Sequence, residues 1–415
     1  MWFLFSAALI LQPGQPLPPI LPGEVVELAP GIHQGPWEIA IPGVTLRAAP
    51  GAVLDGGGAG SALVLSAPGI AVENLRVRNV GRESDFYAPD AAVWLVDCPD
   101  CAVRGLVAAG VTTGVRVEES PRARVEDCDL GGLGDAPGIT LYRSPEALVR
   151  GNRVRGFLDG IYMEYTSGGK AIENVARASR RYGYHLMFSR GVEVARNRVE
   201  EGRVGSAVMY GAGAWVHDNL FRGHVGPLAF GLLVQEQNDS RFERNRVAGN
   251  TVGMLVVSSR GDVFTGNQIE LNGFGVLVQR ERDKGSSALV FERNRFLGNV
   301  YDLAVDDPEA RVVMREGRYD RVPPIDLDHD GAADLPYVPS SSYALFTSRQ
   351  PDLSLFALGP GMLLWERIEA WVPGLAFMTL ADPHPHPERA PRAAPSAWGL
   401  GLVLLGVGGG LWLRS

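Results

Sequence analysis

Two neighbouring segments of the sequence carry side chains with soft donor atoms. His185 and Met187 lie in GYHLM, and Met209 lies at the matching place in GSAVM. Imidazole nitrogen and thioether sulfur suit Cu(I) and suit Mg²⁺ or Ca²⁺ poorly. If both segments are strands on adjacent coils, the two methionines lie about 5 Å apart and His185 lies about 7 Å along its strand. The three residues are a candidate Cu(I) site; the alternative is an apolar outer stripe that a loop or partner covers.

A second candidate metal site lies in the segment IDLDHDGAADLPY. Its acidic residues are spaced like the start of a calcium loop: Asp326, Asp328, Asp330 and Asp334. The twelfth position is Tyr337 rather than Glu, so the segment is not an EF-hand. The pattern leaves open a calcium-stiffened turn or a plain acidic loop.

Carboxylates and aromatic side chains on the same face suggest a different chemistry. Glu118 and Glu164 are a possible acid pair, and sugar rings could stack on nearby aromatic residues, which are Tyr142, Tyr162, Tyr165, Phe188 and Tyr210. The two carboxylates are two coils apart, about 10 Å. This separation is at or beyond the upper end for an inverting glycosidase. A uronate lyase or epimerase also needs a basic group, and only Arg116 is close, so this function is the alternative hypothesis.

A repeat of about 22 residues must position all of these groups. Asparagine recurs at intervals of 22 to 27 residues, at Asn152, Asn174, Asn197, Asn219, Asn245, Asn267 and Asn294. A parallel column of glycines precedes short alternating segments such as GIYME, GYHLM and GLLVQ. Alternation is typical of strands, and a fixed period of this length is typical of a solenoid. The sequence predicts an all-β, right-handed parallel β-helix over residues 17–310, with asparagines stacked as an inward ladder.

The alternation also separates an inner from an outer face. Residues two and four positions after each column glycine face outward. By this count three leucines stack on the outer face, and they form a predicted partner-binding or covered surface: Leu233, Leu255 and Leu277. Cys98 and Cys101 occupy turn positions that hold Ser and Ala in other coils, so they are expected to be structural thiols or a disulfide, with copper binding or redox chemistry as the alternative.

The two ends differ in composition from the repeat. Residues 1–16 are predicted to be a signal peptide, with a buried first strand as the alternative. An Asp-rich loop region is expected over 311–340 and a helical capping or docking segment over 341–380. A Pro- and His-rich tether over 381–396 leads to an apolar run at 397–413, which predicts a transmembrane anchor.

Composition limits the class of protein. The chain has 415 residues, of which 46% are hydrophobic and 21% charged. It is therefore too apolar for a disordered protein and too mixed for a polytopic membrane protein. The formal net charge of −8 argues against a dedicated nucleic-acid binder.

The segment RYGYHLMFS around His185 resembles the characteristic segment of the NosD family of maturation proteins for nitrous oxide reductase. The neighbouring GIYMEYTSG, GSAVMYG and FGLLVQE segments and the Asp326–Tyr337 stretch are also similar to that family. The resemblance implies a periplasmic, membrane-associated β-helix that works with the ABC transporter subunits NosF and NosY. It further implies a copper-carrying lipoprotein and apo-nitrous oxide reductase as partners, and transient copper as cargo. On this hypothesis the chain is a binding and assembly protein, which passes copper to the apo-reductase, and it is not an enzyme.

Overall fold

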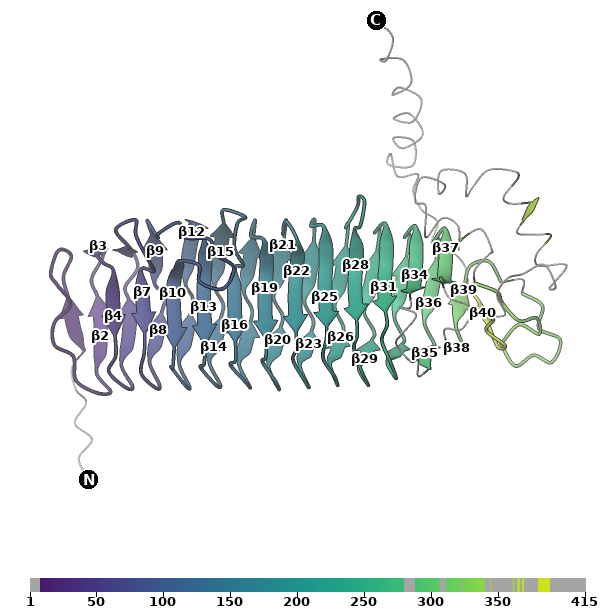
Figure 1. The fold of residues 1–415 in the computed structure, drawn as a ribbon, viewed down its shortest axis with the longest axis horizontal. Coiled ribbons are helices and arrows are strands. Elements are labelled where there is room, and N and C mark those ends of the chain that lie inside the picture. Colours follow the sequence, from purple (N-terminus) through teal and green to yellow (C-terminus); the bar gives the residue numbers. More distant parts are fainter. Residues whose placement is uncertain are drawn as a thin grey trace, which may run out of the picture.

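The computed structural model describes residues 8–279, 288–306, 311–322, 324–339 and 380–388, with Ala344 and four other isolated positions. Within these residues the chain is an all-β solenoid with three parallel sheets that run its whole length (Figure 1). All coils except those at the ends contribute one strand to each sheet, and sequential coils are hydrogen-bonded neighbours. The predicted parallel β-solenoid is confirmed.

Sheet A has 14 strands, which are β1 (Leu9–Leu11), β2 (Val25–Leu28), β5 (Thr45–Ala48), β8 (Ala71–Glu73), β11 (Ala102–Arg104), β14 (Arg124–Glu126), β17 (Leu148–Arg150), β20 (Lys170–Ile172), β23 (Glu193–Ala195), β26 (Trp215–His217), β29 (Arg241–Glu243), β32 (Val263–Thr265), β35 (Leu289–Glu292) and β38 (Val312–Arg315). Sheet B also has 14 strands, which are β3 (Gly31–Gln34), β6 (Ala52–Asp55), β9 (Arg76–Arg78), β12 (Val107–Val111), β15 (Asp129–Gly132), β18 (Arg153–Arg155), β21 (Val175–Arg177), β24 (Arg198–Glu200), β27 (Leu220–Arg222), β30 (Arg246–Ala248), β33 (Gln268–Glu270), β36 (Arg295–Leu297), β39 (Arg318–Tyr319) and β40 (His386–Pro387). Sheet C has 12 strands, which are β4 (Trp37–Ile39), β7 (Leu63–Leu65), β10 (Ala91–Val96), β13 (Thr113–Glu118), β16 (Ile139–Tyr142), β19 (Asp159–Glu164), β22 (Tyr182–Met187), β25 (Val204–Met209), β28 (Phe230–Gln235), β31 (Val252–Val257), β34 (Phe274–Gln279) and β37 (Tyr301–Val305).

The corner between sheets A and B is closed by the predicted asparagine ladder. The side-chain amide of Asn197 donates from Nδ2 to Oδ1 of Asn219 at 2.9 Å, and Asn219 donates in turn to Asn245 at 2.9 Å. The same Oδ1 of Asn219 accepts the backbone N–H of Asn197 at 2.9 Å. Each ladder amide therefore satisfies a buried backbone group and its neighbouring side chain, which is what a buried polar column needs to be stable.

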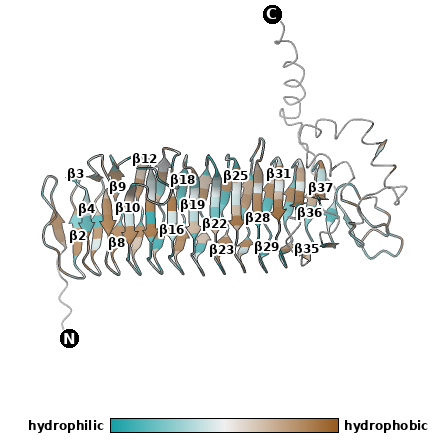
Figure 2. Ribbon diagram, viewed as in Figure 1, coloured by the Kyte–Doolittle hydropathy of each residue, from teal (hydrophilic) through white to brown (hydrophobic). Residues whose placement is uncertain are grey.

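The interior is filled by stacked apolar residues. Phe242, Phe264 and Phe291 stack face to face, with ring centroids 4.7 and 4.5 Å apart. Apolar residues recur along the strands of the whole solenoid (Figure 2). The column glycines are required by close backbone approach, because a Cβ on Gly183 would lie 2.5 Å from the carbonyl oxygen of Gly205. Residues at equivalent positions of successive coils are thus similar in size, and this regularity holds the strands of each sheet in register.

Three segments bear on the boundaries expected from the sequence. Leu9–Leu11 forms the first strand of sheet A with Leu11 buried. Residues 1–7 lie outside the described residues, and the signal peptide expected over 1–16 stays a prediction. The solenoid continues past residue 310, because β38 and β39 complete another coil. Residues 380–388 are packed rather than extended as a tether, because Asp382 is fully buried and accepts hydrogen bonds from Gly317 N–H and Tyr319 Oη.

Cys98 and Cys101 form a disulfide in a buried turn. Cys128 is a free, buried thiol whose pKa burial raises to about 12. Most of the expected capping segment at 341–380 and all of the apolar run at 397–413 lie outside the described residues. Among the residues that are described, no helix has the length and apolarity needed to cross a membrane.

Candidate metal site on the outer face of sheet C

The outer face of sheet C is built from columns of side chains that come from successive coils. Register places Tyr162, His185 and Ala207 in one column, and Glu164, Met187 and Met209 in the next. The predicted pairing is therefore correct in one respect: Met187 and Met209 lie directly opposite each other on β22 and β25. His185 lies two residues before Met187 on the same strand, so all three point to one side of the sheet.

His185 belongs to a buried ionic cluster. Its Nδ1 lies 2.9 Å from Oδ2 of Asp159, and the guanidinium of Arg181 donates from Nε to Oδ1 of the same carboxylate at 2.8 Å. Asp159 is fully buried and His185 is 5% exposed. Burial alone would raise the pKa of Asp159, but the hydrogen bonds from Arg181 and His185 outweigh it and lower that pKa. The carboxylate is thus held ionised and fixes one nitrogen of the imidazole. Among the described residues, Nε2 of His185 has no hydrogen-bond partner.

A tyrosine links His185 to the methionines. The ring of Tyr162 lies 4.9 Å from that of His185, and its hydroxyl donates to Oε2 of Glu164 at 2.6 Å. The same hydroxyl lies 3.9 Å from the sulfur of Met187. Burial and the carboxylate of Glu164 raise the pKa of Tyr162 above its ordinary value, so the phenol stays protonated. The arrangement brings an imidazole, a phenol, a carboxylate and a thioether together on adjacent coils.

A loop from an earlier coil covers this cluster. The segment between β9 and β10 places Phe86 edge-on against Tyr162, with ring centroids 4.9 Å apart. The guanidinium of Arg181 lies 4.8 Å from the centre of the Phe86 ring. His185 is consequently buried although it lies on the outer face, whereas Met187 and Met209 are partly exposed. The site is open at its methionine end and closed at its histidine end.

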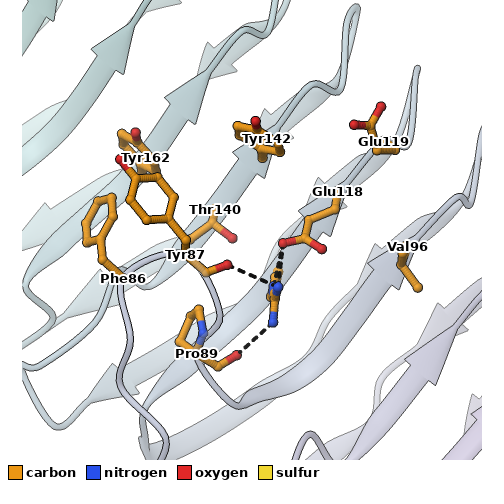
Figure 3. Close-up of a pocket in the computed structure, with 10 residues that line it drawn as sticks. Phe86, Tyr87, Pro89, Val96, Glu118, Glu119, Thr140, Tyr142 and Tyr162 are labelled. Carbon is orange, nitrogen blue, oxygen red and sulfur yellow. Dashed lines mark hydrogen bonds and ion pairs between the residues drawn. The ribbon is translucent and has the colours of Figure 1, made fainter.

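The same loop borders a pocket of about 340 Å³ beside the cluster (Figure 3). Its floor is made by Arg116, whose guanidinium donates to Oε1 of Glu118 at 2.7 Å and to the carbonyl of Tyr87 at 3.1 Å. Tyr142 and Tyr162 form further parts of its wall. Because Tyr162 is common to both, the pocket and the histidine cluster are contiguous.

The proposed acid pair does not have the features of a hydrolytic site. Glu118 and Glu164 are two coils apart in one column, as the sequence predicted. Glu118 is held by Arg116 and by the indole N–H of Trp94, and Glu164 is held by Tyr162. Both carboxylates are therefore committed to neighbouring side chains within the face.

The aromatic residues predicted on this face fall into two groups. Tyr162 is 3% exposed and belongs to the cluster. Tyr165, Phe188 and Tyr210 lie at the following corner, where their rings stack with centroids 5.3 Å apart. All three have a left-handed backbone, at φ of 51°, 50° and 56°. Bulky residues are uncommon in that conformation, and here it projects a line of rings beside the methionines.

The leucine stack lies on the outer face but is covered. Leu233, Leu255 and Leu277 are 7%, 7% and 5% exposed, and they form a second apolar cluster that includes Ala344 from beyond the solenoid. The sequence analysis expected either a partner-binding or a covered surface here, and the described structure shows these leucines covered. A role of these leucines in partner binding stays a prediction.

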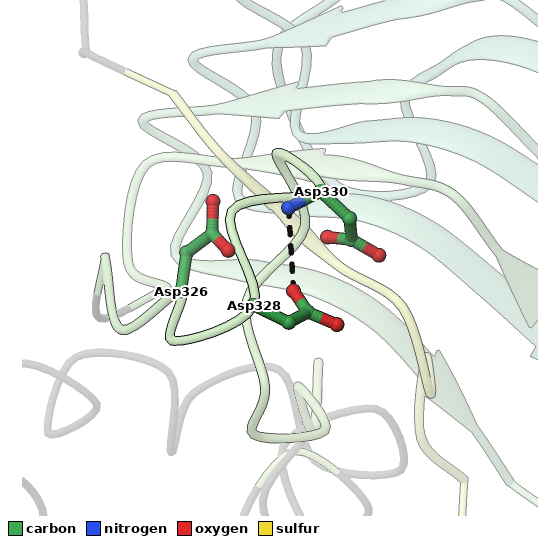
Figure 4. A group of neighbouring side chains, drawn as sticks. All are labelled: Asp326, Asp328 and Asp330. Atoms are coloured by element: carbon green, nitrogen blue, oxygen red, sulfur yellow. Dashed lines mark hydrogen bonds between the residues drawn. The ribbon is translucent and has the colours of Figure 1, made fainter.

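Three residues of the acidic loop converge, as the sequence spacing suggested. Asp326, Asp328 and Asp330 bring one carboxylate oxygen each within 4.8 Å of one another (Figure 4). The loop is also held by backbone donors, because Gly331 N–H donates to Asp326 and Leu327 N–H donates to Asp334. The fourth candidate, Asp334, thus stabilises the turn and lies outside the converging set. Calcium binding stays a prediction.

Sequence reasoning missed Asp159, Arg181 and Phe86. Asp159 is the first residue of β19, and Arg181 comes just before β22, so a charged residue at the start of two neighbouring strands was the available signal. Phe86 lies in a non-repetitive insertion, so no sequence pattern pointed to it.

Comparisons with known proteins agree with the sequence resemblance. Residues 134–313 match the family described as periplasmic copper-binding protein (NosD). A probable ABC transporter binding protein NosD from Pseudomonas aeruginosa is 41% identical over 140 residues, which is 32% of this chain and 32% of that protein. The match therefore spans about a third of that relative. A protein of the same name from Stutzerimonas stutzeri is 26% identical over 395 residues, covering 86% of this chain and 85% of its own length.

Solved structures share the fold. The alginate lyase AlyF-OU02 has a TM-score of 0.58 at 12% identity, covering 72% of this chain and 80% of its own. The periplasmic alginate epimerase AlgG has a TM-score of 0.53 at 17% identity, covering 70% and 77%. At these identities the likeness concerns the β-helix alone.

Proposed function

We propose that this chain is a NosD-type protein and that it carries copper as Cu(I) on His185, Met187 and Met209. The observation that carries the proposal is the state of the imidazole. Asp159 holds Nδ1 of His185, and Nε2 has no hydrogen-bond partner among the described residues. Histidines that bind metals typically donate one ring N–H to a carboxylate, which fixes the tautomer and leaves the other nitrogen free.

The remaining donors suit the cargo. Met187 and Met209 lie opposite each other on neighbouring strands, about 5 Å apart. Thioethers select Cu(I) over hard cations and over Zn²⁺. The two sulfurs lie at the partly exposed end of the cluster, so an ion held there can leave toward another protein. Exchange of a transient cargo needs this kind of one-sided access.

We place this carrier in the assembly of the copper–sulfide centre of nitrous oxide reductase. The chain would receive copper from a copper-carrying lipoprotein, dock on the ABC transporter subunits NosF and NosY, and deliver to apo-reductase in the periplasm. The support is the family description as periplasmic and copper-binding, and the naming of the relatives as ABC transporter binding proteins. The acidic loop at Asp326, Asp328 and Asp330 would add a calcium-stiffened turn beside the last coils.

A binding role is favoured over carbohydrate catalysis. The relatives are named as binding proteins, whereas the alginate-active structures share only the fold. Glu118 and Glu164 are occupied by internal hydrogen bonds and lie two coils apart. Measurable turnover of polyuronates by the purified chain would reverse this preference.

The deciding experiment is a Cu(I) titration against a competing chelator. The double variant Met187→Leu with Met209→Leu keeps apolar volume and removes both outer sulfurs. We expect its Cu(I) affinity to fall about 100-fold or more, with its thermal midpoint nearly unchanged. The matched control is Met163→Leu with Met254→Leu, since these methionines are fully buried in the interior of the same sheet.

The control variant should bind Cu(I) like the wild type. Equal affinities for wild type and outer double variant would show that the outer methionines are not ligands. Asp159→Asn provides an intermediate case, because it removes only the charge that orients His185. We expect a loss of about 10- to 100-fold, as for other groups that orient metal ligands.

A further inference from the structure

The outer face of sheet B is rich in arginine. One outward column of this sheet holds six arginines and one carboxylate, Asp129; the arginines are Arg76, Arg153, Arg198, Arg246, Arg295 and Arg318. The second outward column holds Arg78, Arg155, Arg177 and Arg222. Its carboxylates are Asp55, Glu200 and Glu270. Glu388, which directly follows β40, pairs with Arg295 at 2.8 Å and is a further carboxylate of this face. The face therefore has a formal excess of five positive charges in a chain whose net charge is −8.

The other two faces do not share this excess. On the described outer face of sheet C two arginines, Arg116 and Arg181, accompany four carboxylates, which are Glu38, Glu118, Asp159 and Glu164. On sheet A the outward charges nearly cancel, with seven cationic and six acidic side chains. The positive charge is thus concentrated on one side of the solenoid, where a net count over the whole sequence conceals it.

The carboxylates of sheet B lie beneath the guanidinium groups. Glu200 has a side chain only 3% exposed and pairs with Arg177 at 2.8 Å, Arg198 at 2.7 Å and Arg222 at 3.5 Å. The three arginine side chains are 46% to 59% exposed. Arg76 and Arg153 have no ion pair within the described parts of the chain. Solvent therefore meets guanidinium groups even where the formal charge is balanced.

The side chains between the arginines indicate what kind of surface would fit. In the two outward columns that the structure describes there is no Trp, Tyr, Phe or Met. Protein interfaces are enriched in aromatic residues and methionine at their centres, together with arginine. Guanidinium groups bind phosphate and carboxylate oxygens in pairs. A long row of arginines without aromatic anchors fits a polyanionic surface that needs no particular shape.

The exit of the chain favours a membrane over an acidic protein. The last described strand, β40, lies in sheet B and pairs with β39. Glu388 ends the described segment, and the apolar run at 397–413 begins nine residues later. Nine residues reach at most about 30 Å. A membrane-inserted tail would hold the end of sheet B within that distance of the phospholipid headgroups.

We propose that the outer face of sheet B lies against an anionic phospholipid surface. The strands of this face, each about 4.8 Å from the next, extend over about 60 Å, so many headgroups meet guanidinium groups at once. Sheet C then faces away from the contact, and the histidine–methionine cluster remains accessible to protein partners. The inference stands apart from copper binding, because no residue of that cluster contributes to it.

Vesicle binding of the full-length chain tests the proposal. The probes are vesicles of phosphatidylglycerol mixed with phosphatidylcholine, and vesicles of phosphatidylcholine alone. We expect binding to the anionic vesicles to be about tenfold tighter or more at low salt, and this preference to disappear at about 1 M salt as the charges are screened. The variant Arg76→Gln, Arg153→Gln, Arg222→Gln, Arg318→Gln should lose the preference.

A matched variant on the neutral face separates local from overall charge. The control variant removes an equal number of positive charges, four, from sheet A. It should keep the preference for anionic vesicles, and its substitutions are Arg47→Gln, Lys170→Gln, Arg241→Gln and Arg315→Gln. Equal loss in both variants would overturn the assignment to sheet B. Equal binding to both vesicle types, at any salt, would overturn it in favour of the tail alone. Salt-sensitive binding to a purified acidic partner, without any vesicle preference, would identify the face as a protein contact.

Discussion

The asparagine ladder and the outer face of sheet C are both columns of side chains with one residue per coil. In the ladder, Asn219 accepts from Asn197 and donates to Asn245 and to the carbonyl of Val194, so each polar atom is paired. On the outer face the residue changes from coil to coil, and Nε2 of His185 is left without a partner in the described structure. The comparison shows where this repeat leaves room for a functional site. The inner column repeats one stabilising residue, whereas the outer column varies and leaves atoms available to bind a metal.

The outer face itself divides at the two methionines. Before them it carries the ionic cluster of Asp159, Arg181 and His185; after them it carries the leucine stack. The leucines are as buried as interior residues although they point outward. Burial and orientation must therefore be judged separately in this solenoid.

Removal of one ladder amide should have the largest effect. Asn219→Ala leaves the backbone N–H and Nδ2 of Asn197 without their acceptor in a buried corner. Each orphaned donor costs about 1–3 kcal/mol, so we expect about 4 kcal/mol of destabilisation, measured by urea unfolding. The control is Gln235→Ala, which removes an amide on the outer face and should cost about 1 kcal/mol or less. Similar losses for the two would erase the contrast between ladder and face.

A charge in the leucine stack should have the next largest effect. Leu255→Asp places a carboxylate in the second apolar cluster, where Leu255 is 7% exposed. We expect a loss of about 3 kcal/mol in thermal or urea unfolding, because a buried carboxylate without a partner is costly. Val257→Asp, two residues later on β31 and partly exposed, should cost much less. If both are tolerated, the leucines are open surface and not a second core.

A buried acid at another corner, between sheets C and A, gives a prediction whose size depends on pH. Asp262 is fully buried; its Oδ1 accepts the N–H of Ser240 at 2.8 Å, while Oδ2 has no partner in the described structure. Burial raises the pKa of Asp262 to about 7. The folded state then holds this proton more tightly than the unfolded state does, so stability should fall as pH rises from about 4 to about 7. The slope is at most about 1.4 kcal/mol per pH unit.

Asp262→Asn keeps the acceptor for Ser240 and removes the titration. We expect the variant to be more stable than wild type at pH 8 by up to about 4 kcal/mol, which is the upper bound set by the raised pKa, with the difference vanishing near pH 4. Thermal midpoints across this range provide the measurement. Glu146→Gln, at an exposed corner several coils away, serves as the control and should leave the profile of the wild type unchanged. Parallel curves for wild type and Asp262→Asn would contradict the shifted pKa.

The repeat could be predicted from the sequence because its cause is local and recurrent. In every coil the asparagine makes the same hydrogen bonds and the column glycine permits the same close backbone approach. Their spacing therefore predicts the stacking that the register confirms. The placement of Met187 opposite Met209 follows from that register alone. Alternation within a five-residue strand was enough to separate inward from outward positions.

Contacts that depend on non-repetitive segments could not be predicted in the same way. The cover of His185 by Phe86 comes from an insertion between β9 and β10 that has no period. Asp159 lies at the start of β19, ahead of the glycine from which outward positions were counted, so that count did not place it on the outer face beside His185. The burial of Leu233 and of Asp382 depends on segments beyond the solenoid, for which a coil count makes no statement.

The packed segment at 380–388 has a consequence for how molecules of this protein meet one another. An uncovered last strand presents a row of free N–H and C=O groups, and a second molecule could add its own strand there and begin a fibre. In sheet B that terminal position is taken by His386–Pro387, with Pro383 and Pro385 just before it. Proline has no N–H to offer, so this strand accepts its neighbour β39 on one side and is a poor template on the other. We therefore expect this proline-rich motif to oppose end-to-end polymerisation through sheet B.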